Sequence, residues 1–525
     1  MLARVEEDSA ILHLTQPLQR AAVQYPNRVA TVFQDRTTTY AQLAARVARM
    51  ASALRELGLK EGDRVGLLAH NSDRFVELLY AVWWAGGVVN PINIRWNEWE
   101  MVRALDDCQT RILFVDDQLA PSVARLFDRS EHLEKAIHAG DGNVPSGMFS
   151  CEQLIRDSQP GPDARRHGEQ LAAIFYSGGS RELTKGVMLS HANMMSSVLG
   201  GLERLAVDGD VGLHAAPLFH LAGMMFMLAL TLRATTQVIE PGFQVDDAVK
   251  LIVERGVTNT LLVPTMIHRL LNSADVDKLE HSRLRRLGCV ASASGDHLAA
   301  LCRERLPSVI FSKVYGVPEM APLVSILTYD DDLSKPAGAV GTPSLTTEVR
   351  ILGEDGKEVA RGKTGELVVR GAGLMQGYWN KPAETAKAIR DGWLHTGDAA
   401  YMNEAGQLFV IGKLSDMIVT GGENVICSEV ESVLLLHPSI AACAVIGLPN
   451  EQWGQSVHAI IVPRPGRQLP RLEAIRAHCR NYIAGYKCPV SVEFRDTLPR
   501  SANGEILKSI LQPRSCLHVD AGLAS

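Results

Sequence analysis

The sequence predicts an α/β protein with more than one domain. The chain has 525 residues, which is too long for one ordinary hydrophobic core. Hydrophobic residues make up 46% of it and charged residues 21%, as is typical of a soluble globular protein. Strand-like apolar runs alternate with helical patterns through roughly the first 400 residues, and this alternation favours parallel sheets covered by helices.

The first strong pattern is a helix over residues 39–58. Its apolar residues recur at spacings of three and four, and Gly58 stands where a helix can end. These apolar residues are Leu43, Val47, Met50, Leu54 and Leu57.

The next segments continue the alternation. The apolar run 65–69 predicts a buried strand, and Ser72 is a candidate N-cap for a helix that runs to about Ala85. A further strand is expected over 112–115. Segments 366–370 and 408–411 resemble hairpin strands between glycine-rich turns, and we expect them in a β-barrel-like subdomain.

A domain boundary is expected after residue 414. Residues 412–416 follow a strand, and the remaining residues have the length of a small separate domain. We therefore expect a large N-terminal domain over 1–414 and a small α+β domain over 415–525.

Composition argues against several classes of protein. The net charge is −6, from 53 basic and 59 acidic residues, and no basic run suggests a nucleic-acid partner. The nine cysteines form no C-x-x-C pair and are expected to be reduced thiols. The N-terminus becomes acidic too early for a signal peptide, and apolar stretches such as 224–232 are too short to span a bilayer. We expect a cytoplasmic protein with no membrane partner.

A candidate phosphate-binding loop follows the apolar strand 171–175. It contains Ser177, Gly178, Gly179, Ser180, Arg181, Glu182 and Lys185. Glycines and hydroxyls after a strand let backbone N–H groups approach a phosphate. No glycine precedes Lys185, so the loop is not of the Walker type. Alone, this segment is weak evidence, and an ordinary turn would be the better interpretation.

Several further segments, read in order, resemble the motifs of acyl-CoA synthetases, which belong to the adenylate-forming, AMP-binding superfamily. The resemblance covers essentially the whole chain. The segments are residues 217–223, 315–319, 365–367, 377–379, 393–398, 412–416, 421–424 and 498–508.

This resemblance implies a two-step reaction. An acid attacks ATP to give an acyl-adenylate and pyrophosphate, and the thiol of coenzyme A (CoA) then displaces AMP. The small C-terminal domain is mobile in the family and rotates between the steps. Ser415 stands at the hinge.

The resemblance also implies the residues that hold AMP. Tyr315 would pack on adenine, and Asp398 would hold the ribose hydroxyls, for which a carboxylate is a suitable double acceptor. Lys413 replaces the usual arginine and keeps its charge without the planar fork. Glu319 corresponds to an acidic residue associated with Mg²⁺. The remaining AMP-binding positions are Ser292, Ala293, Ser294 and Gly295, along the adenine edge, and Gly316.

Acyl and CoA positions follow in the same way. His220 corresponds to a gate beside the acyl pocket, which Gly223 and Met224 would line. A histidine or methionine on such an apolar segment could equally be a packed core residue. Gly421 and Gly422 would line the tunnel for the pantetheine of CoA.

The departures from the family pattern concentrate on ATP. Arg181 and Glu182 stand where a hydroxyl residue and a glycine are usual, and Thr184 replaces a proline. Pro318 replaces a threonine whose hydroxyl meets the α-phosphate. Most importantly, Glu505 replaces the lysine that grips the carboxylate and the phosphate during adenylation.

We therefore hypothesise that the protein transfers a preformed acyl group from AMP to CoA. A separate enzyme would make the acyl-adenylate, and Mg²⁺ could be dispensable. Three alternatives remain: a complete ATP-dependent synthetase that uses Lys508 or Lys487, an adenylate-binding pseudoenzyme, or transfer to a carrier protein instead of CoA.

Overall fold

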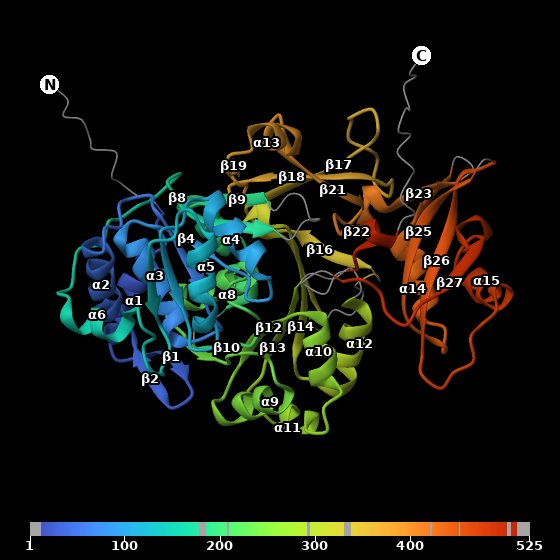
Figure 1. The fold of residues 1–525 in the computed structure, drawn as a ribbon. Helices are drawn as coiled ribbons and strands as arrows, with labels where there is room; N and C mark the ends of the chain where they lie inside the picture. The colour runs from blue at the N-terminus through green and yellow to red at the C-terminus, as the bar shows by residue number, and fades with distance from the viewer. Residues whose placement is uncertain are drawn as a thin grey trace, which may run out of the picture. The chain divides into compact units, whose positions relative to one another are not determined.

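The computed structural model describes most of the chain and confirms a mixed α/β fold with a large N-terminal and a small C-terminal domain (Figure 1). The described residues are 12–177, 185–206, 209–290, 295–329, 336, 338–420, 423–450, 452–500 and 506–511. Two compact units are present. The first contains 1–363, 367–396 and 402–409, and the second contains 364–366, 397–401 and 410–525. The boundary after residue 414 stays a prediction.

One sheet of the first unit has eight strands in the order β19-β9-β8-β4-β3-β5-β6-β7. Its centre is parallel, and Val65 of β3 pairs with Val89 of β4 and Ile112 of β5. Strand β3 is almost wholly buried, as expected for a parallel strand covered on both faces. The bounds are β3 Arg64–Leu68, β4 Val88–Pro91, β5 Ile112–Val115, β6 Lys135–His138, β7 Phe149–Ser150, β8 Leu171–Ser177, β9 Lys185–Ser190 and β19 Gly377–Tyr378.

The second sheet contains the parallel strands β14-β13-β12-β10-β11-β1 in that order. Strands β15 and β16 continue it in antiparallel pairing, and β16 pairs with β22 between Ala339 and Phe409. These strands are β1 Val29–Phe33, β2 Arg36–Thr39, β10 Val211–His214, β11 Thr236–Ile239, β12 Asn259–Leu262, β13 Arg286–Val290, β14 Ile310–Gly316, β15 Leu323–Tyr329, β16 Ala339–Pro343, β17 Thr347–Leu352, β18 Gly365–Gly371, β20 Ile389–Arg390, β21 Trp393–Met402 and β22 Leu408–Lys413.

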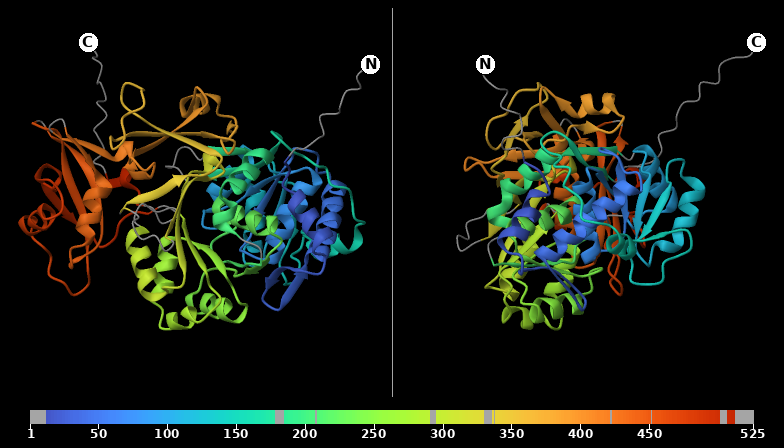
Figure 2. Two further views of the ribbon diagram at one scale, coloured as in Figure 1. Left: turned by 180° about the vertical axis from the view of Figure 1, so that it is seen from behind. Right: turned by 90° about the vertical axis from the view of Figure 1, so that its left-hand side faces the viewer.

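Helices cover both sheets, and α9 to α12 lie beside β12–β14 in the views of Figures 1 and 2. The helices of the first unit are α1 Gln16–Gln24, α2 Tyr40–Glu56, α3 Asp73–Ala85, α4 Glu98–Asp107, η1 Ala120–Ser122, α5 Val123–Arg129, α6 Cys151–Asp157, α7 His191–Leu205, α8 Leu221–Leu232, α9 Val245–Glu254, α10 Pro264–Leu271, α11 Val276–Glu280, α12 Gly295–Arg305, η2 Pro318–Met320 and α13 Pro382–Ala388.

Local chemistry sets the ends of the early helices. The Ser72 hydroxyl accepts a hydrogen bond from Phe75 N at 3.1 Å and so caps α3. Helix α2 begins with a capping box from Thr39 and Gln42. It ends before Gly58, whose φ of +93° is a conformation that favours glycine.

The second unit is a small α+β body. Its sheet has the order β24-β23-β26-β25, with β27 added in parallel to β26. Helix α14 contributes Val430 and Leu434, and α15 contributes Ile475, to one buried core. Its elements are η3 Leu414–Asp416, β23 Met417–Thr420, β24 Glu423–Ile426, α14 Cys427–Leu435, β25 Ile440–Asn450, β26 Gly454–Pro463, α15 Leu472–Arg480, η4 Gly485–Lys487, β27 Ser491–Phe494 and α16 Lys508–Leu511.

Among the residues with described positions, no helix combines the length and apolar character needed to cross a membrane.

Candidate active site

The candidate phosphate loop connects two paired strands. Strands β8 and β9 are antiparallel, and Ser177 at the end of β8 pairs with Lys185 at the start of β9. The two ends of the loop are therefore neighbours. The side chain of Ser177 and the loop residues Gly178, Gly179, Ser180, Arg181, Glu182 and Thr184 lie outside the described residues.

A tyrosine joins two of the predicted site residues. Lys185 Nζ lies 4.6 Å from the centre of the Tyr378 ring, and Tyr378 Oη donates a hydrogen bond to Glu319 Oε1 at 2.8 Å. Burial raises the pKa of Tyr378, and the nearby charge of Glu319 raises it further. The phenol therefore stays protonated and keeps this hydrogen bond. Sequence reasoning named Tyr378 only as part of a motif and did not identify this link.

Glu319 has one property that suits Mg²⁺. It is a half-buried carboxylate held in place by Tyr378, and Mg²⁺ in nucleotide sites is bound by one or two carboxylates together with substrate phosphates. Elsewhere in the described part of the chain, no group of three or more His, Cys, Asp or Glu is placed to hold a metal ion. The assignment of Mg²⁺ to Glu319 stays a proposal.

The predicted adenine platform lies at the end of β14. Tyr315 is half-buried, and Gly316 ends the strand. A Cβ at Gly316 would lie 1.9 Å from the carbonyl oxygen of Pro322, so a side chain cannot be accommodated there without a backbone shift. Pro318 follows in η2 and offers no hydroxyl. Gly295 begins α12, whereas Ser292, Ala293 and Ser294 lie outside the described residues.

The predicted ribose carboxylate and its neighbouring cation are in contact. Asp398 on β21 is 5% exposed, and Lys413 Nζ at the end of β22 lies 2.7 Å from its Oδ1. The Lys413 side chain is 53% exposed, so its charge stays hydrated while it compensates the buried carboxylate. Glycine at 397 has a φ of +67°, and its N–H donates to Glu366 Oε1 at 3.3 Å. These residues all belong to the second unit.

The predicted acyl-pocket residues lie at the start of α8. His220 is the residue before the helix, and its ring lies 4.7 Å from that of Phe219. Burial lowers the pKa of His220 to about 4, with a smaller contribution from the charge of Arg95. The imidazole is therefore neutral near pH 7. Met224 is fully buried, and a Cβ at Gly223 would lie 2.3 Å from the carbonyl oxygen of Pro217.

A buried asparagine holds the segment that leads to His220. Asn71 Nδ2 donates to the carbonyl of Ala216 at 2.9 Å, and Leu218 N donates to Asn71 Oδ1 at 2.7 Å. Asn71 is 3% exposed. Sequence reasoning missed this residue, because its partners are far away in the chain and no local pattern indicates them.

The two alternative lysines are both paired with carboxylates. Lys508 Nζ lies 2.7 Å from Glu431 Oε1 and 3.8 Å from Asp416 Oδ2. Burial lowers the pKa of Lys508, but the nearby groups, of which Glu431 has the largest effect, together raise it above its usual value. Lys487 Nζ donates to both carboxylate oxygens of Glu429 at 2.8 Å.

The remaining C-terminal predictions fall largely outside the described residues. Gly421, Gly422 and Glu505 are among these, and only the backbone of Ser415 is described, in η3.

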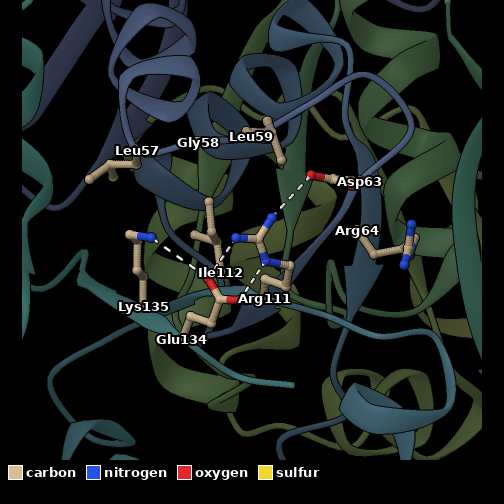
Figure 3. Close-up of a pocket in the computed structure, with 9 residues that line it drawn as sticks. All are labelled: Leu57, Gly58, Leu59, Asp63, Arg64, Arg111, Ile112, Glu134 and Lys135. Atoms are coloured by element: carbon tan, nitrogen blue, oxygen red, sulfur yellow. Dashed lines mark hydrogen bonds and ion pairs between the residues drawn. The ribbon is translucent and has the colours of Figure 1, made fainter. Parts of the chain in front are cut away.

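A small pocket in the first unit is unrelated to these residues (Figure 3). Its volume is about 10 Å³, enough for about one water molecule. Arg111 is held there by Glu134, with Nη2 2.6 Å from Oε2, and by Asp63 at 3.7 Å. The pocket contains none of the predicted site residues, and its ion pairs indicate a structural role.

Comparisons with known proteins support the family assignment. The "AMP-binding enzyme" family model matches residues 18–379, and the "AMP-binding enzyme C-terminal domain" model matches 429–505.

Individual relatives match along nearly their full length. A feruloyl-CoA synthase of Amycolatopsis sp. is 35% identical over 501 residues, which cover 95% of this chain and 98% of the relative. A 2-succinylbenzoate–CoA ligase of Geobacillus kaustophilus (strain HTA426) is 32% identical, with 94% and 96% covered. The structure of o-succinylbenzoate CoA synthetase from Bacillus subtilis with its acyl-adenylate intermediate has a TM-score of 0.82, 26% identity, and 94% and 97% coverage. The chain therefore belongs to the AMP-binding enzyme family, as an enzyme of the acyl-CoA synthetase and ligase type.

Proposed function

We propose that the protein transfers the acyl group of a preformed acyl-adenylate to CoA, and that ATP-dependent adenylation is lost or very weak. The observation that carries this proposal is Glu505. It stands where the closing motif of the family has a lysine that grips the acid and the phosphate. The other substitutions, Arg181, Glu182 and Pro318, also fall on positions that the resemblance assigns to ATP.

Electrostatics makes adenylation the sensitive step. A like-charge contact at about 4 Å costs about 4 kcal/mol at an effective dielectric constant of about 20. Because the family lysine attracts the phosphate and a glutamate repels it, the total change in interaction free energy is roughly twice this cost. Even half of that total is about 4 kcal/mol, which lowers a rate by about three powers of ten. Glu505 and Glu182 would both act on this step.

The pairing of the alternative lysines supports the same conclusion. Lys508 is only 16% exposed and contacts Glu431 and Asp416, and Lys487 is held by both oxygens of Glu429. Either lysine would have to leave its carboxylate before it could bind an acid and a phosphate. Breaking such a partly buried pair leaves an uncompensated charge behind.

Thioester formation makes smaller demands on the protein. The CoA sulfur attacks the acyl carbonyl carbon, the bond between that carbon and the phosphate oxygen breaks, and AMP leaves with the electron pair. The thiol proton passes to solvent. A thiol with a pKa of about 8.5 is partly ionised at neutral pH, and there is no β- or γ-phosphate to hold. The residues that the resemblance assigns to AMP, Tyr315, Asp398 and Lys413, are retained in the sequence.

A separate adenylating enzyme must then supply the acyl-adenylate. The same pattern of substitutions resembles the non-adenylating acyl-CoA ligase of platensimycin and platencin biosynthesis. That resemblance implies a bulky polycyclic diterpenoid acid as the acyl group. Met224, Met225 and Met227 are buried in α8, the helix that begins directly after His220, and flexible methionines can adapt to such a group.

A second candidate is a complete ATP-dependent synthetase. The relatives favour it, because they are named as CoA synthases and ligases. A carrier protein could also replace CoA as the thiol acceptor.

One experiment separates these functions. The full-length protein is incubated with acid, ATP, Mg²⁺ and CoA, or with synthetic acyl-adenylate and CoA, and acyl-CoA is quantified for diterpenoid, aromatic and fatty acyl groups. The proposal expects product from the adenylate alone. Efficient product from ATP, with pyrophosphate release, identifies a complete synthetase. Product from neither mixture identifies a pseudoenzyme, or a carrier-protein ligase if a pantetheinylated carrier protein is acylated instead.

A further inference from the structure

A buried lysine lies two residues before Tyr315, the predicted adenine platform. Lys313 is in β14, between Cys289 of β13 and Leu327 of β15 in the sheet, and it is 2% exposed. Lysine is almost never fully buried unless its charge is paired. Its position in a central strand therefore calls for a specific partner.

That partner is Asp296, at the first turn of α12. Lys313 Nζ lies 2.8 Å from Asp296 Oδ1, and Tyr329 Oη donates to the same oxygen at 3.0 Å. The N–H of Gly338 donates to Asp296 Oδ2. Burial raises the pKa of Tyr329, and the charge of Asp296 raises it further, so the phenol remains a donor. Three separate segments thus converge on one carboxylate.

Both charged residues are close in sequence to residues that are predicted to contact adenine. Asp296 directly follows the segment Ser292 to Gly295, and Lys313 precedes Tyr315 by two residues. Side chains two residues apart lie on the same face of a strand. A single ion pair therefore connects the start of α12 to the strand that carries the predicted adenine platform.

We propose that Lys313 and Asp296 are positioning residues for the nucleobase of the bound adenylate. Their ion pair holds the start of α12 against β14, two residues before Tyr315, and so keeps the adenine platform in place for the base. The proposal rests on the adenylate binding that is part of the proposed function. It does not depend on which half-reaction the protein performs.

The test compares a ligand with a base and one without. AMP and ribose 5-phosphate share the sugar and phosphate, and only AMP carries the base that is expected to pack on Tyr315. In Lys313→Met the Kd for AMP should rise about tenfold or more, which corresponds to about 1.4 kcal/mol. The Kd for ribose 5-phosphate should stay within about twofold. Both are measured by calorimetry on the full-length protein, and Lys313→Arg should restore part of the AMP affinity.

A matched control is available in the same unit. Lys278 forms an ion pair of the same length, 2.8 Å, with Asp275, but its side chain is 61% exposed. Lys278→Met should leave both dissociation constants unchanged. If Lys313→Met does not fold, Tyr329→Phe replaces it, because this variant removes one hydrogen bond to Asp296 without leaving a charge unpaired. It should weaken AMP binding about threefold or more.

The results separate this inference from the proposed function. An unchanged AMP affinity in a folded Lys313→Met or Tyr329→Phe protein overturns the positioning role, and so does an equal loss for AMP and ribose 5-phosphate. A wild-type protein that binds neither ligand contradicts the adenylate binding on which both proposals rest. Detection of ATP-dependent activity would overturn the half-reaction proposal and leave the positioning role intact.

Discussion

The Asp398→Asn variant should lose affinity for AMP far more than it loses stability. The buried carboxylate can accept from both ribose hydroxyls, whereas an asparagine has one acceptor oxygen and no charge. Hydrogen bonds to charged groups contribute about 1.5–3 kcal/mol each, and neutral ones about 0.5–1.5 kcal/mol. Losing one charged bond and weakening the other costs about 2–4 kcal/mol, or roughly 30- to 1,000-fold in Kd.

The effect on stability should be much smaller. The ion pair that is lost involves Lys413, whose side chain is 53% exposed, and such pairs contribute at most about 1 kcal/mol. Calorimetric titration with AMP gives the binding loss, and urea unfolding gives the stability. Glu493→Gln serves as a control, because it removes an exposed ion pair with Arg495 in the same unit and should change neither AMP affinity nor the expected ribose contacts.

A second ligand identifies the hydroxyls as the cause. AMP should bind the natural protein more tightly than 2′-deoxy-AMP does, and this difference should shrink in Asp398→Asn. A folded variant whose AMP affinity falls less than about threefold would refute the assignment of Asp398 to the ribose.

Three other outcomes are expected. Glu505→Lys should restore ATP–pyrophosphate exchange only partly, because the phosphate-loop substitutions remain. Full restoration would show that the phosphate-loop substitutions do not impair adenylation. Gly223→Ala should lower the free energy of unfolding by about 1–3 kcal/mol, since the added Cβ would lie 2.3 Å from the carbonyl oxygen of Pro217. Gly242→Ala is the control, because a Cβ added at Gly242 would meet no atom within 4 Å. Equal losses of unfolding free energy for the two variants in denaturant titrations would contradict the predicted clash. His220 has its pKa lowered to about 4 by burial, so between pH 6.5 and 4 the unfolded chain binds a proton that the folded chain does not. The contribution of His220 to stability is therefore constant above pH 6.5 and decreases as the pH falls through that window. In His220→Gln, the free energy of unfolding measured against pH should have a flatter slope between pH 6.5 and 4. An unchanged slope would refute the lowered pKa.

Local patterns were sufficient to predict much of the fold. The strand at 112–115 has the bounds expected for it, and the helix capped by Ser72 ends at Ala85 as expected. The helix expected over 39–58 is shorter, Tyr40–Glu56, because the backbone already turns at Gly58 with φ +93°. Periodicity and capping depend on neighbouring residues, so they can be read from the chain directly.

The site was predictable only in part, because its geometry depends on residues far apart in sequence. Motifs indicated Asp398 and Lys413, and these residues are in contact. Tyr378, Asn71 and Lys313 were not assigned roles, although each connects segments of the site through a long-range contact. A lysine inside an apolar run shows no sign of its partner until the sheet brings β14 beside α12.

The most direct test of the account is ATP–pyrophosphate exchange by the natural protein, measured on the same preparation that converts acyl-adenylate and CoA to acyl-CoA. Exchange requires only the adenylation step, in which Glu505 replaces the expected lysine. If Glu505 disables adenylation, the protein forms the thioester, and its exchange does not exceed that of a heat-inactivated sample. Exchange at a rate comparable to thioester formation would contradict it.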